Sequence, residues 1–384
     1  MRILHTSDWH LGRTLHGVDL LEHQRAHLDH LVDVVRDREV DVLVVAGDVY
    51  DRAVPSVPTV RLLSEALGRL SEWATVIVTP GNHDSAVRLG FGAGLMRDGV
   101  HLLASVDAIA SPVVVHDGAG PVAFYGLPYL DPDSVRGMLS PTDEPLARSH
   151  EAVTGAALDR VRADLEARPG TRSVVVAHAF VVGGNPSESE RDIRVGGVDS
   201  VPSAAFAGFD YVALGHLHGA QSVGSGVPVI RYSGSPLAFS FGEKNQVKST
   251  ALVELRADGS VEVELIPAPV PRRLAEVTGD LVSLVGGEFD DLRDAWLRVF
   301  VTDPVHPANL HALIRDYFPH TLAIQHTPRD GAAVSARGIV GVEADPVEVA
   351  TEFVAFATGA AATETEVHVL RSAYEMALAR ETSL

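Results

Sequence analysis

Short apolar runs typical of β-strands alternate with helical patterns from the N-terminus to about residue 265. The expected strands are 3–6, 42–46, 75–79, 122–127, 173–177, 211–214 and 229–232, and the expected helices are about 20–39, 57–72 and 150–168. Strands separated by helices are typical of layered α/β proteins. The sequence therefore predicts an α/β domain that closes with a β-hairpin of 252–255 and 261–266, joined through Ala257, Asp258 and Gly259.

A proline-rich segment, PAPVPRR at 267–273, follows this hairpin. Prolines neither donate to a β-ladder nor continue a helix, so three of them in five residues predict a domain boundary. We place the first domain at 1–268 and the second at 269–384. Expected strands at 297–301 and 322–325, with helices near 307–317, 345–357 and 365–381, predict a small α+β domain.

Five polar clusters stand where expected strands of the first domain end. They are Asp8-Trp9-His10, Gly47-Asp48, Gly81-Asn82-His83-Asp84, Ala177-His178 and Gly215-His216-Leu217-His218. Each cluster alone has an ordinary explanation, because Gly-Asp and Gly-Asn pairs are common in turns and most histidines near strand ends bind no ligand. Ligand sites of open α/β sheets lie outside the carboxyl ends of the strands. Five clusters in this position therefore favour one shared site.

The residue types in these clusters favour a site for two metal ions. The chain contains no cysteine, which excludes disulfides and thiolate ligands, and imidazole with carboxylate suits Mn, Fe or Zn. Two ions about 3.5–4 Å apart can hold the attacking water and the leaving oxygen of a displacement at phosphorus. Asp48, on a central strand, is the best candidate for a bridging carboxylate. Asn82 offers an amide oxygen, which leaves His83 free to protonate a leaving alkoxide.

The ordered motifs SDWHLG, AGDVYD, PGNHD, VVAHAF and LGHLH resemble those of the calcineurin-like metallophosphoesterases over residues 5–218. This resemblance implies a β-sandwich flanked by helices, with a smaller C-terminal α+β capping domain. More narrowly, HTSDWHLGRTLHG, SESERDIRVGGVDSVPSAAF, DYVALGHLHGAQ and RYSGSPLAFSFGEKNQVKS are similar to the nuclease subunits of bacterial complexes of the SbcC–SbcD type. The similarity to these subunits covers roughly residues 1–268 and is loose beyond them.

The resemblance also implies roles for individual residues. One ion would be held by Asp8, His10, Asp48 and His218, and the other by Asp48, Asn82, His178 and His216. His83 would be the catalytic histidine, and Mn²⁺ the expected metal. Asp51 stands where archaeal and eukaryotic relatives carry a histidine in the loop after the Gly-Asp pair. The roles of Asp51 and Asp84, which could orient His83, stay open at this point.

The charge balance limits how the chain could contact DNA. Its net charge is −20, and Lys244 and Lys248 are its two lysines, which excludes a polylysine track for DNA. Local grip would come from arginines near the motifs, such as Arg13, Arg191 and Arg194. The chain contains no G-x-x-x-x-G-K-[ST] motif, so control by ATP would need another polypeptide.

The resemblance implies such a partner, an SbcC-like ATPase, together with a DNA substrate. It implies double-strand exonuclease and single-strand or hairpin endonuclease activity in DNA end processing, repair and recombination. It further implies a homodimer within a heterotetramer, formed through helical segments near 57–72 and 86–97. The last helix could pack on its own small domain or provide a docking surface for the partner.

Other features set the remaining expectations. The sequence contains no run of eighteen apolar residues, so no membrane span is expected. The N-terminus lacks a signal-peptide pattern, so the cytoplasm is the expected location. The polar stretch GGNPSESERD at 183–192 predicts a surface loop. A stand-alone phosphoesterase acting on a small nucleotide or phosphomonoester is the main alternative function. A scaffold without chemistry is disfavoured because no ligand position has been lost.

Overall fold

The computed structural model describes residues 1–384 except 97–98, 191–199, 329–344, 359–361 and 382–384. The chain divides into two compact units, Met1–Leu274 and Ala275–Leu384. The division follows the proline-rich segment, and each unit has its own hydrophobic core.

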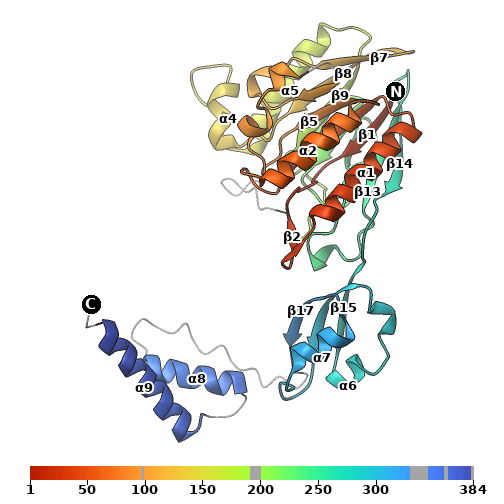
Figure 1. Cartoon of the computed structure of the whole chain (residues 1–384). Coiled ribbons are helices and arrows are strands. Elements are labelled where there is room, and N and C mark those ends of the chain that lie inside the picture. Colours follow the sequence, from red (N-terminus) through yellow and green to blue (C-terminus); the bar gives the residue numbers. More distant parts are fainter. Residues whose placement is uncertain (97–98, 191–199, 329–344, 359–361, 382–384) are drawn as a thin grey trace. The chain divides into compact units, whose positions relative to one another are not determined.

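The first unit contains two six-stranded sheets (Figure 1). The first sheet has the order β14-β13-β1-β4-β5-β6, in which β1, β4, β5 and β6 run parallel and β13 pairs antiparallel with β1. Its strands are β1 (Arg2–Thr6), β4 (Val42–Ala46), β5 (Thr75–Thr79), β6 (Val100–Leu102), β13 (Ser249–Leu255) and β14 (Val261–Pro267). The expected hairpin is confirmed as the antiparallel pair β13–β14.

The second sheet has the order β11-β12-β10-β9-β8-β7. Its central strands β8, β9, β10 and β12 run parallel, and β7 and β11 pair antiparallel at the two edges. The strands are β7 (Val113–Asp117), β8 (Gly120–Leu127), β9 (Arg172–His178), β10 (Tyr211–Gly215), β11 (Gln221–Val223) and β12 (Val229–Tyr232). Strands β1, β4, β5, β8, β9, β10 and β12 correspond to the seven expected from the sequence.

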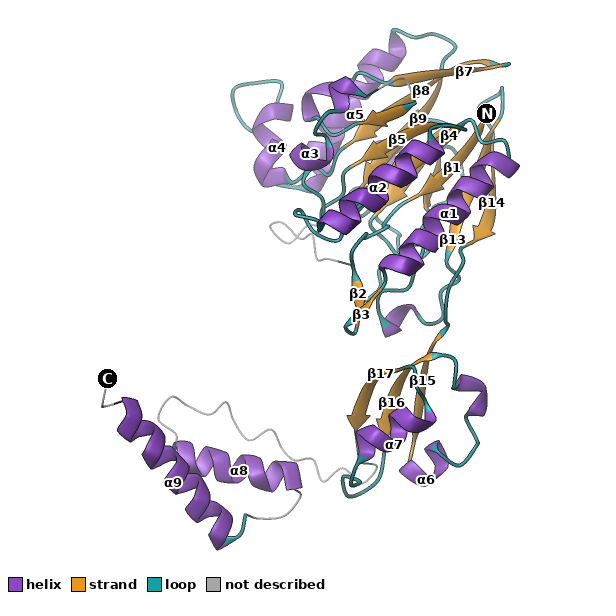
Figure 2. Cartoon of the chain, viewed as in Figure 1, coloured by secondary structure: helices purple, strands orange, loops and turns teal. Residues whose placement is uncertain are grey.

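The two sheets pack face to face, and helices cover their outer faces (Figure 2). Apolar residues of both sheets form the core between them, including Ile3, Val44, Phe124, Val176 and Ala213. Helices α1 (Leu21–Asp37) and α2 (Val57–Leu70) pack on the first sheet, and α4 (Pro132–Leu139) and α5 (His150–Glu166) on the second. Because the central strands are covered on both faces, they read as continuous apolar runs in the sequence. The predicted β-sandwich flanked by helices is confirmed.

The helix expected near 86–97 is much shorter in the structure. Helix α3 spans only Ala86–Leu89, and a 3₁₀ turn follows at Ala93–Leu95. Glycines at 90, 92 and 94 interrupt this stretch, and Gly92 adopts a left-handed φ of 78°. Helix α3 ends with Gly90 as its C-cap, and Gly92 in this conformation cannot continue a right-handed helix, so the helical turn and the 3₁₀ turn stay separate.

The second unit contains a three-stranded sheet of order β15-β16-β17, formed by β15 (Leu274–Gly279), β16 (Trp296–Val301) and β17 (Thr321–His326). Its core includes residues of α6 (Leu281–Leu284) and α7 (Leu310–Tyr317). Helices α8 (Pro346–Thr358) and α9 (Glu364–Glu381) contact each other. The expected α+β composition is therefore confirmed, and β15 is a strand that the sequence pattern did not predict. In the described part of the chain, no helix has the length and hydropathy needed to cross a bilayer.

Candidate metal centre

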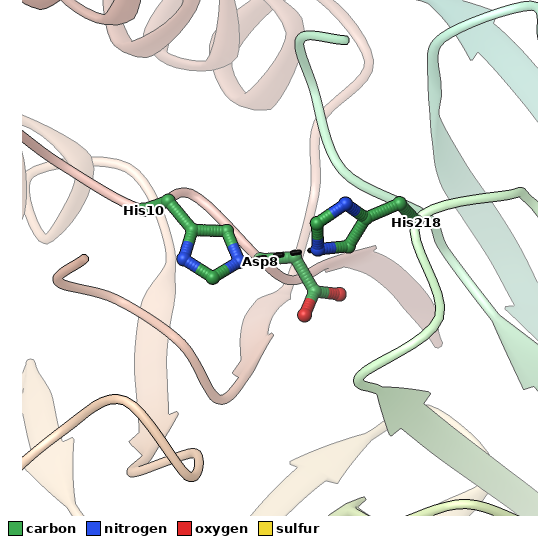
Figure 3. A group of neighbouring side chains, drawn as sticks. All are labelled: Asp8, His10 and His218. Carbon is green, nitrogen blue, oxygen red and sulfur yellow. Dashed lines mark hydrogen bonds between the residues drawn. The ribbon is translucent and has the colours of Figure 1, made fainter. Parts of the chain in front are cut away.

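The polar clusters of five strand ends meet at one place. They follow β1, β4, β5 and β10, or end β9 in the case of His178. Three groups of side chains bring potential ligand atoms within 4.8 Å of one another: Asp8, His10 and His218; His10, Asp48 and His83; and Asp8, Asp48 and His178. Figure 3 shows the first group, which joins the ends of two strands from different sheets. Residues 208 positions apart in the sequence thus face each other, with His10 Nε2 3.2 Å from His218 Nε2.

Asp48 occupies the centre of this arrangement. Its Oδ2 lies 3.4 Å from His178 Nε2, 3.6 Å from His10 Nε2 and 4.0 Å from His83 Nε2. It belongs to two of the three groups. Asp48 thus lies near histidines carried by strands of both sheets, His10 after β1 and His178 at the end of β9, which is compatible with a carboxylate shared by two ions.

The remaining predicted ligands lie beside His178. Asn82 Oδ1 is 2.9 Å from His178 Nε2. The ring of His216 packs edge-on against that of His178, with 5.4 Å between the ring centroids, and His216 is buried. None of the three groups in the described residues includes His216. The structure thus brings His216 to the centre, but with its ligand atom less closely grouped than those of the other histidines.

Four of the predicted ligands have a strained backbone conformation. Among the described residues, seven that are not glycine have positive φ, and Asp8, His10, Asp48 and His216 are four of them, with φ of 53°, 43°, 49° and 109°. Such conformations cost about 1–3 kcal/mol each and cluster at functional sites. The sharp turns direct these side chains inward past the strand ends.

Two glycines of the motifs keep space open beside the ligands. A Cβ added at Gly81 would lie 2.2 Å from Asp48 Oδ1, and one added at Gly47 would lie 2.3 Å from His178 Nδ1. Non-bonded atoms do not approach each other this closely, so a Cβ at either glycine would displace the neighbouring ligand side chain. Glycine is therefore required at these positions because the ligands themselves occupy the space.

Burial and neighbouring charges determine the protonation of the ligands. Burial would raise the pKa of Asp48, but the adjoining histidines, chiefly His178, hold this pKa well below its usual range. Burial would lower the pKa of His178, but the carboxylates of Asp48 and Asp8 raise it to about 9. Burial raises the pKa of Asp8 to about 6, and it lowers the pKa of His216 to about 3. Without a metal ion at neutral pH, Asp48 is therefore ionised, His216 is neutral and His178 is protonated, so a cation bound to the ring of His178 would replace its proton.

This set of donors fits two divalent cations. It offers carboxylate, imidazole and amide groups, which suit Mn, Fe or Zn, and its ligand atoms already face one another across short distances. Nδ1 of His10 is buried and has no hydrogen-bond partner among the described residues, while Nε2 faces the centre. The ring thus presents its Nε2 as a ligand atom.

His83 lies at the edge of the centre and is partly exposed. Its Nδ1 is 2.9 Å from the carbonyl oxygen of Asp51, and its backbone N–H donates to Asp48 Oδ1 over 2.8 Å. With Nδ1–H donating to that carbonyl, Nε2 points toward Asp48 at 4.0 Å. His83 borders a pocket of about 500 Å³ that is also lined by Arg13, Thr14, Asp51, Arg52, Ala53, Asn82 and Asp84. This position suits proton transfer to a group bound in the pocket.

Asp84 and Asp51 have different roles in this geometry. The carboxylate of Asp84 accepts hydrogen bonds from the backbone N–H groups of Gly81, Val49 and Tyr50, and so joins the loops that follow β4 and β5. The ring of His83 is oriented instead by the backbone carbonyl of Asp51. The carboxylate of Asp51 lies 3.7 Å from both His10 Nδ1 and Arg13 Nη1.

Several residues near the centre had no role in the sequence analysis. Ser189, Glu243 and Lys248 lie behind His218, and Glu190 accepts a hydrogen bond from the backbone N–H of His218 over 2.8 Å. The described part of the expected surface loop, 183–190, therefore also supports the centre, because Ser189 and Glu190 contact a predicted ligand. Positions 191 and 194, whose arginines we expected near DNA, lie outside the described residues.

Known structures with a similar fold have little sequence identity to this chain. TT1561 of Thermus thermophilus is 14% identical, with 69% of this chain and 98% of that one covered and a TM-score of 0.40. GAP50, the anchor in the inner membrane complex of Plasmodium, is 12% identical, with 70% of this chain and 85% of that one covered and a TM-score of 0.41. Vps29 from Entamoeba histolytica, complexed with Zn²⁺, is 14% identical, with 70% of this chain and 99% of that one covered and a TM-score of 0.27. At these TM-scores the similarities add nothing about function.

The match to a family model is more informative. The model described as calcineurin-like phosphoesterase matches residues 1–220, which is more than half of the chain and includes every strand end of the metal centre. The clustered histidines and aspartates are compatible with the two divalent ions of a phosphoester-hydrolysing metalloenzyme. The chain belongs to the calcineurin-like phosphoesterase family.

Proposed function

We propose that this protein is an SbcD-type DNA nuclease subunit that cuts phosphodiester bonds with two divalent cations, Mn²⁺ being the expected ion. The observation that carries the proposal is the convergence of the eight motif residues beside a pocket lined by Arg13 and Arg52. Six of the eight residues have grouped ligand atoms, and Asn82 and His216 adjoin His178. A phosphodiester in this pocket would lie beside Asn82 and His83 and near the positive side chains of Arg13 and Arg52.

Asp8, His10, Asp48 and His218 would hold one ion, and Asp48, Asn82, His178 and His216 the other. When bound, the two ions would activate water and neutralise charge on the phosphate oxygens. Water would attack phosphorus as the bond from phosphorus to the leaving oxygen breaks, and His83 would supply the proton that this oxygen gains. The carbonyl of Asp51 keeps Nδ1 of His83 as the other N–H, so Nε2 is the nitrogen that delivers the proton.

The choice of DNA rests on the narrower resemblance and on the local charge. Arg13 stacks on Phe239, with 4.8 Å from its guanidinium carbon to the ring centroid, and donates to the carbonyl oxygen of Ser189 over 3.1 Å. Its Nη1 is buried, makes no hydrogen bond among the described residues and lies 3.7 Å from the carboxylate of Asp51. The guanidinium is thus held at the wall of the pocket, where its positive charge would attract a phosphate. It provides local attraction in a chain whose net charge of −20 opposes DNA elsewhere.

We further propose that an SbcC-like ATPase is the partner and that the protein forms a homodimer. The chain lacks a phosphate-binding motif for ATP. Large apolar side chains are exposed on α2 and on the stretch after His83, including Val57, Val87, Phe91 and Leu95. Arg88 of α3 donates to the carbonyl oxygen of Ala53, which joins α3 to the loop before α2. An exposed apolar surface of this kind favours association with a second copy.

The test compares substrates under one condition. Purified protein with Mn²⁺ is offered a hairpin-ended DNA duplex, a short single strand, a chromogenic phosphodiester and a phosphomonoester, with and without an ATPase partner. We expect cleavage of single strands and hairpin ends by the protein alone, and duplex degradation only with the partner and ATP. Efficient hydrolysis of the phosphomonoester without DNA cleavage would instead establish the small-molecule phosphoesterase.

A further inference from the structure

The two nitrogens of His218 face different environments. Nε2 points to the metal centre, 3.2 Å from His10 Nε2. Nδ1 points away from it, 2.7 Å from Ser189 Oγ and 3.2 Å from Glu243 Oε1. A neutral imidazole with its proton on Nδ1 would thus donate toward a carboxylate and offer Nε2 to a cation.

Glu243 is held in this place by a buried lysine. Its Oε2 accepts a hydrogen bond from Lys248 Nζ, and its Oε1 accepts one from the backbone N–H of Phe239 over 3.2 Å. Lys248 also donates to Ser235 Oγ over 2.9 Å and to the carbonyl oxygen of His218 over 3.0 Å. Glu243 and Lys248 are only 1% and 4% exposed. One of the two lysines of the chain is therefore used to anchor a carboxylate inside the protein.

Such a buried ion pair is costly, because both charges lose their hydration. Replacing it with apolar side chains is often neutral or stabilising, so fold stability alone gives little reason for it. The pair here touches both the ring and the backbone of a ligand candidate. A role in orienting that ligand accounts for its position.

In the part of the chain that the structure describes, His178, a ligand candidate for the other ion, has no carboxylate behind its ring in this way. Nδ1 of His178 lies 2.9 Å from the carbonyl oxygen of Ala46, an uncharged acceptor. Nδ1 of His10 has no hydrogen bond among the described residues, and the carboxylate of Asp51 is 3.7 Å away from it. Carboxylates thus stand behind both histidines of one proposed ion position, while a neutral carbonyl stands behind His178 of the other.

We propose that Glu243, anchored by Lys248, is a positioning residue for His218 and makes the two ion positions unequal. A carboxylate behind a ligand histidine fixes its tautomer and ring orientation and raises its basicity. Glu243 therefore strengthens binding of the ion shared by Asp8, His10 and His218, with little effect on the ion shared by Asn82, His178 and His216. This inference rests on the proposed metal centre.

The experiment measures metal binding directly. The full-length protein is stripped of metal and titrated with Mn²⁺ by calorimetry, and bound Mn²⁺ is followed by electron paramagnetic resonance. In Glu243→Gln we expect one of two ions to bind about 10–100-fold more weakly, the range typical of a lost partner behind a metal ligand. The other ion should bind within about threefold of its original affinity, and the spectrum should change from that of a coupled pair to that of a single ion.

The matched control is Glu190→Gln, which makes the same chemical change beside the backbone N–H of His218 instead of its ring. It should leave both affinities within about threefold. If Glu243→Gln folds poorly, Glu243→Gln/Lys248→Met removes both charges of the pair and should show the same selective weakening.

Equal weakening of both ions, or unchanged affinities in the variants, would overturn the inference. Binding of fewer than two ions by the unmodified protein would instead contradict the proposed metal centre. These two failures are therefore distinguishable in one set of titrations.

Discussion

The inner wall of the metal centre and its outer rim are built differently. The wall consists of Asp8, His10, Asp48, His178, His216 and His218, all buried and four of them with positive φ. The rim consists of Arg13, Asp51, Arg52 and His83, which line the pocket and range from 16% to 84% side-chain exposure. The wall is thus fixed by the strands and tight turns of the fold, whereas the rim can meet a substrate. The difference predicts that wall substitutions change metal binding and that rim substitutions change substrate binding or turnover.

The largest effect is expected from Asp48→Ala in the wall. This carboxylate lies within 4.0 Å of ring nitrogens from His10, His83 and His178, so its loss removes the shared ligand and leaves two cations repelling each other. We expect neither ion to bind tightly and hydrolysis to fall to background. Calorimetric titration with Mn²⁺ measures this, with His218→Ala as the comparison that should affect mainly one ion. Two ions bound to Asp48→Ala at near original affinity would show that Asp48 is no bridge.

A smaller effect is expected from His83→Ala in the rim. If His83 is the proton donor, turnover should fall about 10²–10⁴-fold while both ions stay bound. Metal content per chain and turnover should be measured on the same preparation. The loss should be smaller for a chromogenic substrate, because its good leaving group needs less protonation.

The structure also gives a reason why His83→Ala could lose a metal ion instead. His83 is grouped with His10 and Asp48 among possible ligands, and its ring centroid is 4.7 Å from that of His10. Loss of a metal ion in His83→Ala would therefore move His83 from the rim to the wall and assign it as a ligand.

Arg13→Ala tests whether the rim contacts DNA. Loss of one charged hydrogen bond to phosphate should weaken binding of a single-stranded oligonucleotide about 10-fold and lower the salt dependence of binding by roughly one phosphate contact. Metal content and hydrolysis of a small chromogenic phosphodiester should change little. Fluorescence anisotropy at several salt concentrations measures the binding. Arg52→Ala is the matched control, because Arg52 lines the same pocket but is 84% exposed and should contribute less.

The wall was predictable from the sequence and the surroundings of its ligands were not. Parallel strands end at one edge of a sheet, so the order of strands and motifs was enough to place Asp48 and Asn82 together after β4 and β5. His178 ends β9 of the other sheet, and its place beside them was expected from the family resemblance. Glu243 and Lys248 reach His218 from a loop after β12, and no periodicity links those positions. The edge strands β6 and β11 have only three residues each, too few for a clear pattern. The role of Asp84 was also hidden, because it binds backbone N–H groups that carry no sequence signal.

Burial alone does not make a histidine a ligand, and His27 sharpens this point. It lies in α1, as buried as the wall histidines, and neither of its ring nitrogens has a hydrogen bond among the described residues. Burial lowers the pKa of His27 to about 3. His5 is also buried, with its pKa lowered to about 3 by burial, although its ring lies 2.9 Å from the hydroxyl of Tyr211 and 3.1 Å from the carbonyl oxygen of Leu214.

The smallest effect we predict is a change in stability at mildly acidic pH. Because the folded-state pKa of His27 lies below its unfolded value of about 6.5, the unfolded chain takes up a proton that the folded chain does not. Stability is therefore lost as pH falls from about 6.5 toward 3, and this residue alone should cost about 1 kcal/mol between pH 7.5 and 5.5. His27→Leu removes an unsatisfied buried group, so it should stabilise the protein by about 1 kcal/mol at pH 7.5 and about 2 kcal/mol at pH 5.5. Urea unfolding of the metal-free protein at both pH values measures these differences. If His27→Leu has the same pH dependence of stability as the original chain, the pKa of His27 is not lowered on folding. His27 would then have a proton acceptor or a water molecule beside its ring in the folded protein.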